Sequence, residues 1–167
     1  MKNEKLKSES LHCEVERIGL DLSDSVARTK LFSEINNRGE KAIILTEGVI
    51  PYLDEESVSS LARDIKKQAN FKLWISEYYS PGVYPKFKAS NFKKLLGDSP
   101  FKFFPEAWFP FFKKNGWVQK EITYLYDEAS SVGRDFPLPW WASAIQFIIG
   151  KERMMREIKI FSAYLVF

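Results

Sequence analysis

Apolar residues recur along most of the chain at the period of a strand or of a helix. Short apolar runs predict strands at residues 14–22, 42–45, 71–78, 117–126 and 158–167. Apolar residues spaced three and four apart predict helices at 23–37, 55–69, 105–115 and 140–149. This alternation predicts an α/β fold whose last two strands pair antiparallel, and the polar residues 1–12 are expected to form an N-terminal tail.

The most informative stretch is 41–69, KAIILTEGVIPYLDEESVSSLARDIKKQA. Its apolar run 42–45 has no polar interruption, which is typical of a central strand covered on both faces. Gly48 and Pro51 then break the strand, and Asp54 is expected to cap the following helix. Ligands of open α/β sheets bind at the carboxyl ends of strands, so Glu47 and Tyr52 are expected to face a ligand crevice. In the alternative interpretation, Glu47 caps the local backbone and Tyr52 packs.

A second strand end carries similar residues. The predicted strand 71–78 closes with Glu77, Tyr78 and Tyr79 just before the loop signal Ser-Pro-Gly. These residues are therefore expected at the same carboxyl-end edge as Glu47.

Composition excludes several kinds of protein. The 45% hydrophobic content argues against disorder, and no apolar run is long enough to span a membrane. The single Cys13 excludes an internal disulfide, and with one histidine, His12, no zinc site is expected. A net charge of +3 does not by itself indicate a nucleic-acid partner. We expect a cytoplasmic protein with neither a nucleic-acid nor a membrane partner.

Residues 86–114 form a basic and aromatic segment that offers a rival function. Aromatic rings between lysines could stack on single-stranded nucleic acid or insert into an anionic membrane, which would make the chain a non-catalytic binding module. The simpler interpretation is amphipathic, with the rings facing the sheet and the lysines facing water.

The string TEGVIPYLDEESVSSLARDI resembles a motif of S-adenosylmethionine-dependent methyltransferases of the leucine carboxyl methyltransferase family. Three further segments resemble that family in the right order. They are a strand ending in Asp21-Leu22, a late helix ending in Gly116-Trp117, and a closing edge strand, EIKIFSAYLVF. The resemblance covers residues 13–167.

The resemblance implies an O-methyltransferase that uses S-adenosylmethionine and a small-molecule or peptide acceptor. It implies that Glu47 attracts the ammonium or sulfonium end of the cofactor, that Gly48 lets the backbone approach it, and that Asp21 and Leu22 contact the adenine. Tyr52, Tyr78 and Tyr79 would line the acceptor side. A carboxylate acceptor needs no general base, whereas a hydroxyl acceptor does. Asp21 could instead belong to a helix-capping turn, and the pair Trp140-Trp141 could either wall the substrate pocket or seal the core.

The chain departs from the family in one respect. It contains no glycine-rich turn, which in the family cradles the methionine end of the cofactor. Residues 13–167 therefore resemble the C-terminal portion of such an enzyme, an incomplete Rossmann-like class I methyltransferase sheet with flanking helices. Such a portion, truncated relative to the family, need not be active alone. Its open sheet edges predict self-association or pairing with a complementary chain, and a shortened chain, a separate N-terminal partner and a rearranged fold all stay open.

Overall fold

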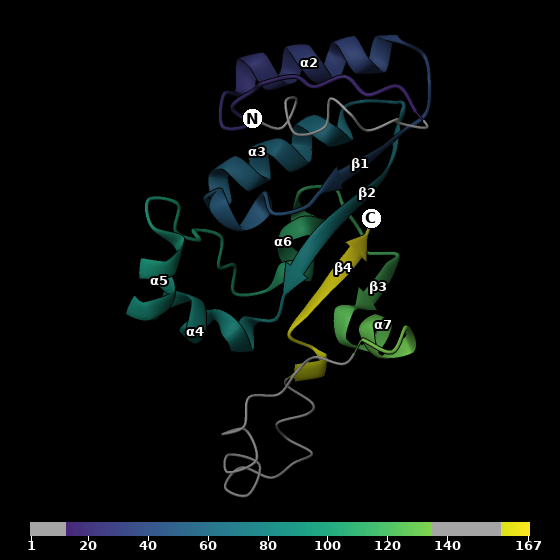
Figure 1. Cartoon of the computed structure of the whole chain (residues 1–167). Coiled ribbons are helices and arrows are strands. Elements are labelled where there is room, and N and C mark those ends of the chain that lie inside the picture. Colours follow the sequence, from purple (N-terminus) through teal and green to yellow (C-terminus); the bar gives the residue numbers. More distant parts are fainter. Residues whose placement is uncertain (1–12, 135–157) are drawn as a thin grey trace, which may run out of the picture.

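The computed structural model describes residues 13–134 and 158–167 (Figure 1). One sheet has the strand order β1-β2-β4-β3, built from β1 (Ala42–Thr46), β2 (Phe71–Tyr79), β4 (Ser162–Val166) and β3 (Glu121–Tyr124). β1 and β2 are parallel, and β4 runs antiparallel to both of its neighbours. The α/β class and the antiparallel pairing of the last two strands are confirmed. The closing strand was expected at an edge but lies inside the sheet.

Two helices, α3 (Glu55–Lys66) and α6 (Trp108–Lys114), pack on one face of this sheet. Asp54 caps α3 as predicted, because its Oδ1 accepts the N–H of Ser57 at 2.8 Å. The predicted apolar stripe of α3 is buried: Val58, Leu61, Ala62 and Ile65. The helix-covered face therefore contains the core.

Trp74, in the middle of β2, is the centre of that core and is 0% exposed. Its ring centroid lies 5.3 Å from those of Phe112 and Trp117 and 5.5 Å from that of Phe167. Its indole N–H donates to Oγ1 of Thr46 on β1 at 3.1 Å. One side chain thus links α6, the chain after α6, the C-terminus and both parallel strands.

Helix α2 (Ser25–Asn37) packs on α3, on the side away from α6 (Figure 1). The helix begins at Ser25, two residues after the predicted start at 23, because the side chain of Asp24 accepts the N–H groups of Val26 and Ala27 in the first turn. Arg28 of α2 is 1% exposed and donates hydrogen bonds to Asp64 and Ser60 of α3. A buried guanidinium needs such partners, so this ion pair fixes how α2 sits on α3.

The predicted strand at 14–22 is wrong. These residues form no strand, and Val15 and Ile18 are 46% and 49% exposed. A strand needs a neighbouring backbone to accept its hydrogen bonds, whereas this segment has a side-chain ion pair of Glu16 with Arg38, the residue after α2, at 3.0 Å. Its apolar pattern had indicated a strand without showing what would pair with it.

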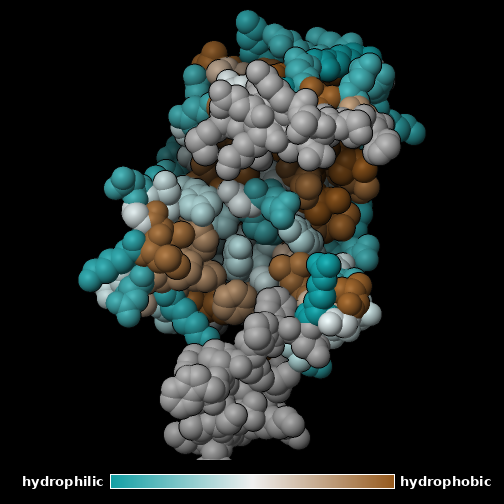
Figure 2. Space-filling view, viewed as in Figure 1, coloured by the Kyte–Doolittle hydropathy of each residue, from teal (hydrophilic) through white to brown (hydrophobic). Residues whose placement is uncertain are grey.

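The run 42–45 is a strand, but its predicted place in the sheet is wrong. Among the residues described, β1 pairs only with β2 and is an edge strand. Ala42 and Ile44 pack against the core, while Ile43 and Leu45 on the opposite face are 62% and 57% exposed. Figure 2 views that opposite face and shows hydrophobic residues gathered over β1 and β2. We call it the open face.

The basic and aromatic segment 86–114 has the amphipathic arrangement. It contains part of α4 (Tyr84–Lys88), all of α5 (Ser90–Leu96) and α6, and it follows the short 3-10 turn η2 (Pro81–Val83). Four of its aromatic side chains are buried: Phe87, Phe103, Trp108 and Phe112. Six of its lysines are exposed: Lys86, Lys88, Lys94, Lys102, Lys113 and Lys114.

Several elements near the C-terminus differ from prediction, and β4 begins at Ser162 rather than at 158. α6 begins at Trp108 rather than at Pro105, and β3 covers only part of the predicted strand 117–126. The strand starts later than predicted because Trp117 is bonded to helices instead of to a strand. Its backbone N–H donates to the carbonyl of Phe112, and its indole N–H donates to the carbonyl of Ala62 at 2.8 Å. The helix α7 (Leu125–Ser131) was not predicted, and its first two residues fall within the predicted strand 117–126. The predicted helix 140–149, with Trp140 and Trp141, lies outside the described residues.

Within residues 13–134 and 158–167, no helix combines the length and the apolar character that crossing a membrane requires.

The position of Trp74 predicts a large effect of its removal. Trp74→Ala should lower the free energy of unfolding by about 3–5 kcal/mol, because it leaves a cavity at the contact of α6, β1 and β2. Val26→Ala, at a site 79% exposed, is the matched control and should change stability by less than about 0.5 kcal/mol. Urea unfolding followed by circular dichroism measures both. A loss under about 1 kcal/mol for Trp74→Ala would contradict this description of the core.

Candidate functional site

The candidate site lies at the carboxyl ends of β1 and β2, where the chain leaves β1 through Glu47 and Gly48. Gly48 has a φ of +63°, a conformation that side-chain-bearing residues rarely adopt, and no atom lies within 4 Å of where a Cβ would be. This turn leads into the short 3-10 helix η1 (Ile50–Tyr52). The strand β1 ends at Thr46, so the predicted break of the strand at Gly48 is confirmed.

Glu47 is exposed, and its Oε1 accepts a hydrogen bond from the hydroxyl of Tyr164 at 2.9 Å. Tyr164 belongs to β4, which lies on the far side of β2 from β1. Burial raises the pKa of Tyr164, and the hydrogen bond to Glu47 and the negative charge of Glu47 raise it further, to about 12. The tyrosine hydroxyl therefore stays a donor to Glu47 over the whole physiological pH range.

Glu77 on β2 is the buried acid of this group and is 6% exposed. Its Oε1 accepts the N–H of Val49 at 3.0 Å and that of Ile50 at 2.9 Å, at the start of η1. Its Oε2 is buried and has no hydrogen-bond partner in the structure described. Burial raises the pKa of Glu77, the two N–H donors oppose that rise, and the nearby charge of Glu47 adds to it.

Tyr52 and Tyr79 lie near these acids and share a neighbour. The centroid of Phe101 lies 5.0 Å from that of Tyr52 and 6.1 Å from that of Tyr79. Burial raises the pKa of Tyr79, and the charges of Glu77 and Tyr52 raise it further. The predicted residues Glu47, Gly48, Tyr52 and Tyr79 therefore gather at one end of the sheet.

Tyr78 lies elsewhere, because neighbouring residues of a strand point to opposite faces. Its ring is 8% exposed and packs on the helix-covered face, 5.2 Å from Trp108 and stacked 5.8 Å from Phe109. The structure thus places Tyr78 in the core, away from Tyr79.

Asp21 and Leu22 form the turn before α2. Oδ1 of Asp21 accepts the N–H and the hydroxyl of Ser23 at 2.9 and 2.8 Å, which lowers the pKa of Asp21. The carbonyl of Leu22 accepts a hydrogen bond from Arg28. These contacts match the helix-capping alternative for Asp21 and tie both residues to α2, whereas the contacts of Glu47 tie it to β4.

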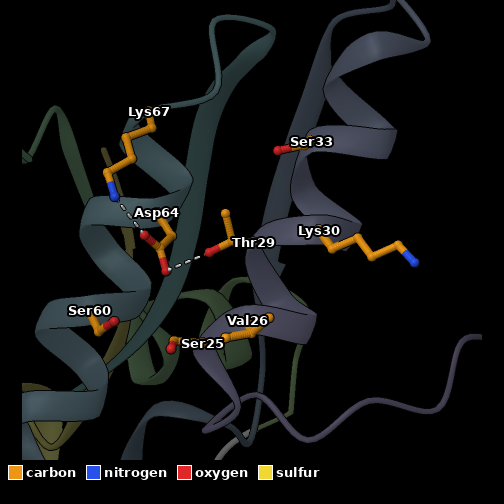
Figure 3. Close-up of a pocket in the computed structure, with 8 residues that line it drawn as sticks. All are labelled: Ser25, Val26, Thr29, Lys30, Ser33, Ser60, Asp64 and Lys67. Atoms are coloured by element: carbon orange, nitrogen blue, oxygen red, sulfur yellow. Dashed lines mark hydrogen bonds and ion pairs between the residues drawn. The ribbon is translucent and has the colours of Figure 1, made fainter.

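A separate groove of about 520 Å³ lies between α2 and α3 (Figure 3). Asp64 is the only acid among its lining residues, and it already bonds Thr29, Lys67 and the buried Arg28. Burial raises the pKa of Asp64, but the hydrogen bonds from Arg28 and Lys67 outweigh this and hold it below its ordinary value. The groove is therefore the seam of a helix–helix contact, and no predicted site residue lines it.

Sequence reasoning placed Glu77 at this edge without assigning it a role, and it missed Tyr164. Glu77 could have been singled out as an acid inside an apolar strand, which usually needs a buried partner. Tyr164 carried no such signal, because only the insertion of β4 beside β2 brings it to Glu47.

Comparison of the sequence with protein-family models and with curated proteins finds no match. The function must therefore be argued from the chemistry of the site. This edge of the sheet carries two carboxyl groups, a glycine turn at Gly48 and two half-buried tyrosines. Such an edge suits a cationic ligand that has an apolar part.

The buried carboxyl of Glu77 predicts a pH dependence of stability. Folding raises the pKa of Glu77. Its contribution to the free energy of unfolding is therefore complete below the ordinary pKa of 4.5 and is lost as the pH rises through the higher pKa of the folded state. Wild type should therefore lose stability relative to Glu77→Gln as the pH rises from 4.5 towards 7, which urea unfolding at a series of pH values measures.

Glu40→Gln, at an exposed loop position, is the control and should follow the wild-type profile. A wild-type curve that runs parallel to that of Glu77→Gln over this pH range would contradict the assignment.

Proposed function

We propose that the chain contributes the C-terminal portion of the cofactor site of an S-adenosylmethionine-dependent O-methyltransferase. Its acceptor would be a carboxylate or hydroxyl of a small molecule or peptide. The observation that carries the proposal is the position of Glu47 and Gly48 at the carboxyl end of a parallel strand. The resemblance of residues 46–65 to the methyltransferase motif implies that place for them.

The electrostatics of the edge support a cationic ligand. Glu47 is an exposed carboxylate, and the buried Glu77 behind it adds negative character whenever it is ionised. The methionine end of S-adenosylmethionine carries an ammonium and a sulfonium, and a carboxylate close to them favours binding by Coulomb attraction. The open space at Gly48 leaves room for a ligand to approach the backbone.

The sheet supports the proposal in part. A parallel strand pair followed by an antiparallel C-terminal pair is the arrangement that the resemblance implies. The contacts of Asp21 and Leu22 serve α2, so the proposal rests on Glu47 and Gly48 rather than on an adenine site at residues 21–22.

The methyl transfer requires few catalytic groups from the protein. The cofactor supplies a methyl group on an electrophilic sulfonium, and the chain must align it with the acceptor and exclude water. Tyr52 and Tyr79, packed on Phe101, provide a half-buried wall beside the acids for the acceptor. A carboxylate acceptor is already ionised at neutral pH, so this wall need not contain a base.

The test compares two ligands that differ in one charge. S-adenosylmethionine should bind about two- to fivefold more tightly than S-adenosylhomocysteine, whose sulfur is neutral, because an exposed carboxylate pair contributes up to about 1 kcal/mol. Glu47→Gln should remove most of this difference, while Glu40→Gln should keep it. Amide NMR titration measures the affinities and should locate the shifts at Glu47 and Gly48.

Equal affinity of the wild type for both ligands, or no shift at these residues up to millimolar ligand in a folded sample, would overturn the proposal.

A further inference from the structure

Glu47, Glu77 and Tyr164 lie side by side on the open face, although they come from three different strands or strand ends. β2 lies between β1 and β4, and Glu77 of β2 is the register partner of Tyr164 of β4. Glu47 follows Thr46, the partner of Ser76, which places it next to Glu77. The hydrogen bond from Tyr164 to Glu47 therefore crosses β2 at the position of Glu77. It bridges the two flanking strands over a carboxyl group that is only 6% exposed.

Two properties of this acidic pair indicate that it lacks a partner. Oε2 of Glu77 is buried and accepts no hydrogen bond in the structure described, although a buried carboxylate oxygen normally has a donor. Among the described residues, no lysine or arginine forms an ion pair with Glu47 or Glu77. A single group that carries both a positive charge and N–H donors would supply what the two acids lack.

The chemistry of the pair selects among cations. Residues 13–134 and 158–167 contain no cluster of three or more acidic, histidine or cysteine side chains that could hold a metal ion. Calcium and zinc need more ligands than two carboxyl groups supply. A sulfonium or a quaternary ammonium has the charge but no hydrogen to donate, so it would leave Oε2 of Glu77 without a partner. A primary ammonium has the charge and several N–H donors.

The surroundings of the two acids fit an ammonium that is attached to an alkyl chain. Residues two apart on a strand share a face, so Leu45 lies near Glu47 and Tyr79 lies near Glu77 on the open face. Leu45 is 57% exposed, and Tyr79 packs on Phe101. An alkyl chain that leaves the acids along this face therefore meets apolar surface.

We propose that Glu47 and Glu77 together bind the primary ammonium group of an alkylammonium ligand. The ammonium donates to Oε2 of Glu77 and to the carboxylate of Glu47. Because the bond between Tyr164 and Glu47 crosses over Glu77, the ligand reaches Oε2 only when it displaces the Tyr164 hydroxyl. The site does not require methyl transfer. Applied to S-adenosylmethionine, where the inference rests on the proposed function, it assigns the ammonium rather than the sulfonium to Glu77.

Butylammonium and butyltrimethylammonium test the proposal, because they share the charge and the alkyl chain but only the first has N–H donors. NMR titration at neutral pH measures both affinities from the side-chain carboxyl carbon of Glu77 and from the amides of Val49 and Ile50, which donate to it. Butylammonium should bind at least about tenfold more tightly, because only this ligand donates hydrogen bonds to the charged carboxyl groups.

Variants separate hydrogen bonding from ligand size and from general charge attraction. Glu77→Gln should reduce the preference for butylammonium to less than about threefold, whereas exclusion of the bulkier ligand by its size would leave the preference unchanged. Tyr164→Phe should bind butylammonium about two- to fivefold more tightly, because no hydroxyl has to be displaced from Glu47. Glu121→Gln, at an exposed position of β3, is the control and should match wild type. If Glu77→Gln does not fold by circular dichroism, Glu47→Gln should weaken butylammonium more than butyltrimethylammonium.

Three results would overturn the proposal. They are equal affinity of the folded wild type for the two ligands or no shift of Glu77 at a large excess of butylammonium, a preference that Glu77→Gln retains, and binding to Tyr164→Phe that is no tighter than to wild type. The cofactor test is distinguishable from this one. A chain that prefers butylammonium but binds no S-adenosylmethionine would support the ammonium site and refute the proposed function.

Discussion

One buried carboxyl group joins the two parallel strands at the end where the candidate site lies. Oε1 of Glu77 on β2 accepts the N–H groups of Val49 and Ile50, which follow the turn at Gly48. Without this acceptor, two N–H groups at the start of η1 would lose their hydrogen bonds, one of them on the fully buried Ile50. The path of the chain after β1, and with it the position of Glu47, therefore depends on an acid that sequence reasoning left without a role.

The two faces of the sheet differ in what they contribute, one to stability and the other to the candidate site. The helix-covered face holds Trp74, Phe112 and Phe167, and its close aromatic packing supplies the apolar burial on which stability depends. On the open face, Glu47 bonds Tyr164, and Ile43 and Leu45 remain exposed. Ligand recognition is thus proposed for the face that carries little of the core. A rigid covered layer holds that surface in place.

Local patterns predicted local structure well. The capping of α3 by Asp54, its buried stripe and the break at Gly48 all depend on residues close in sequence, and all are found. The failed predictions among the strands all depend on partners. Residues 14–22 have an apolar pattern but no strand beside them, and an apolar run such as 42–45 cannot show whether a layer covers both of its faces. The carboxyl-end position of Glu47 followed from the pattern, whereas its bond to Tyr164 required the strand order.

The central claim is that Glu77 is a buried, hydrogen-bonded carboxyl that organises the acidic edge. NMR titration of its side-chain carboxyl carbon, with the amide protons of Val49 and Ile50 followed in the same samples, measures this directly. The account predicts a midpoint above 4.5 for the carboxyl and amide shifts of Val49 and Ile50 that follow the same midpoint. A carboxyl that titrates at or below 4.5, or amides that do not respond to its ionisation, would contradict the account.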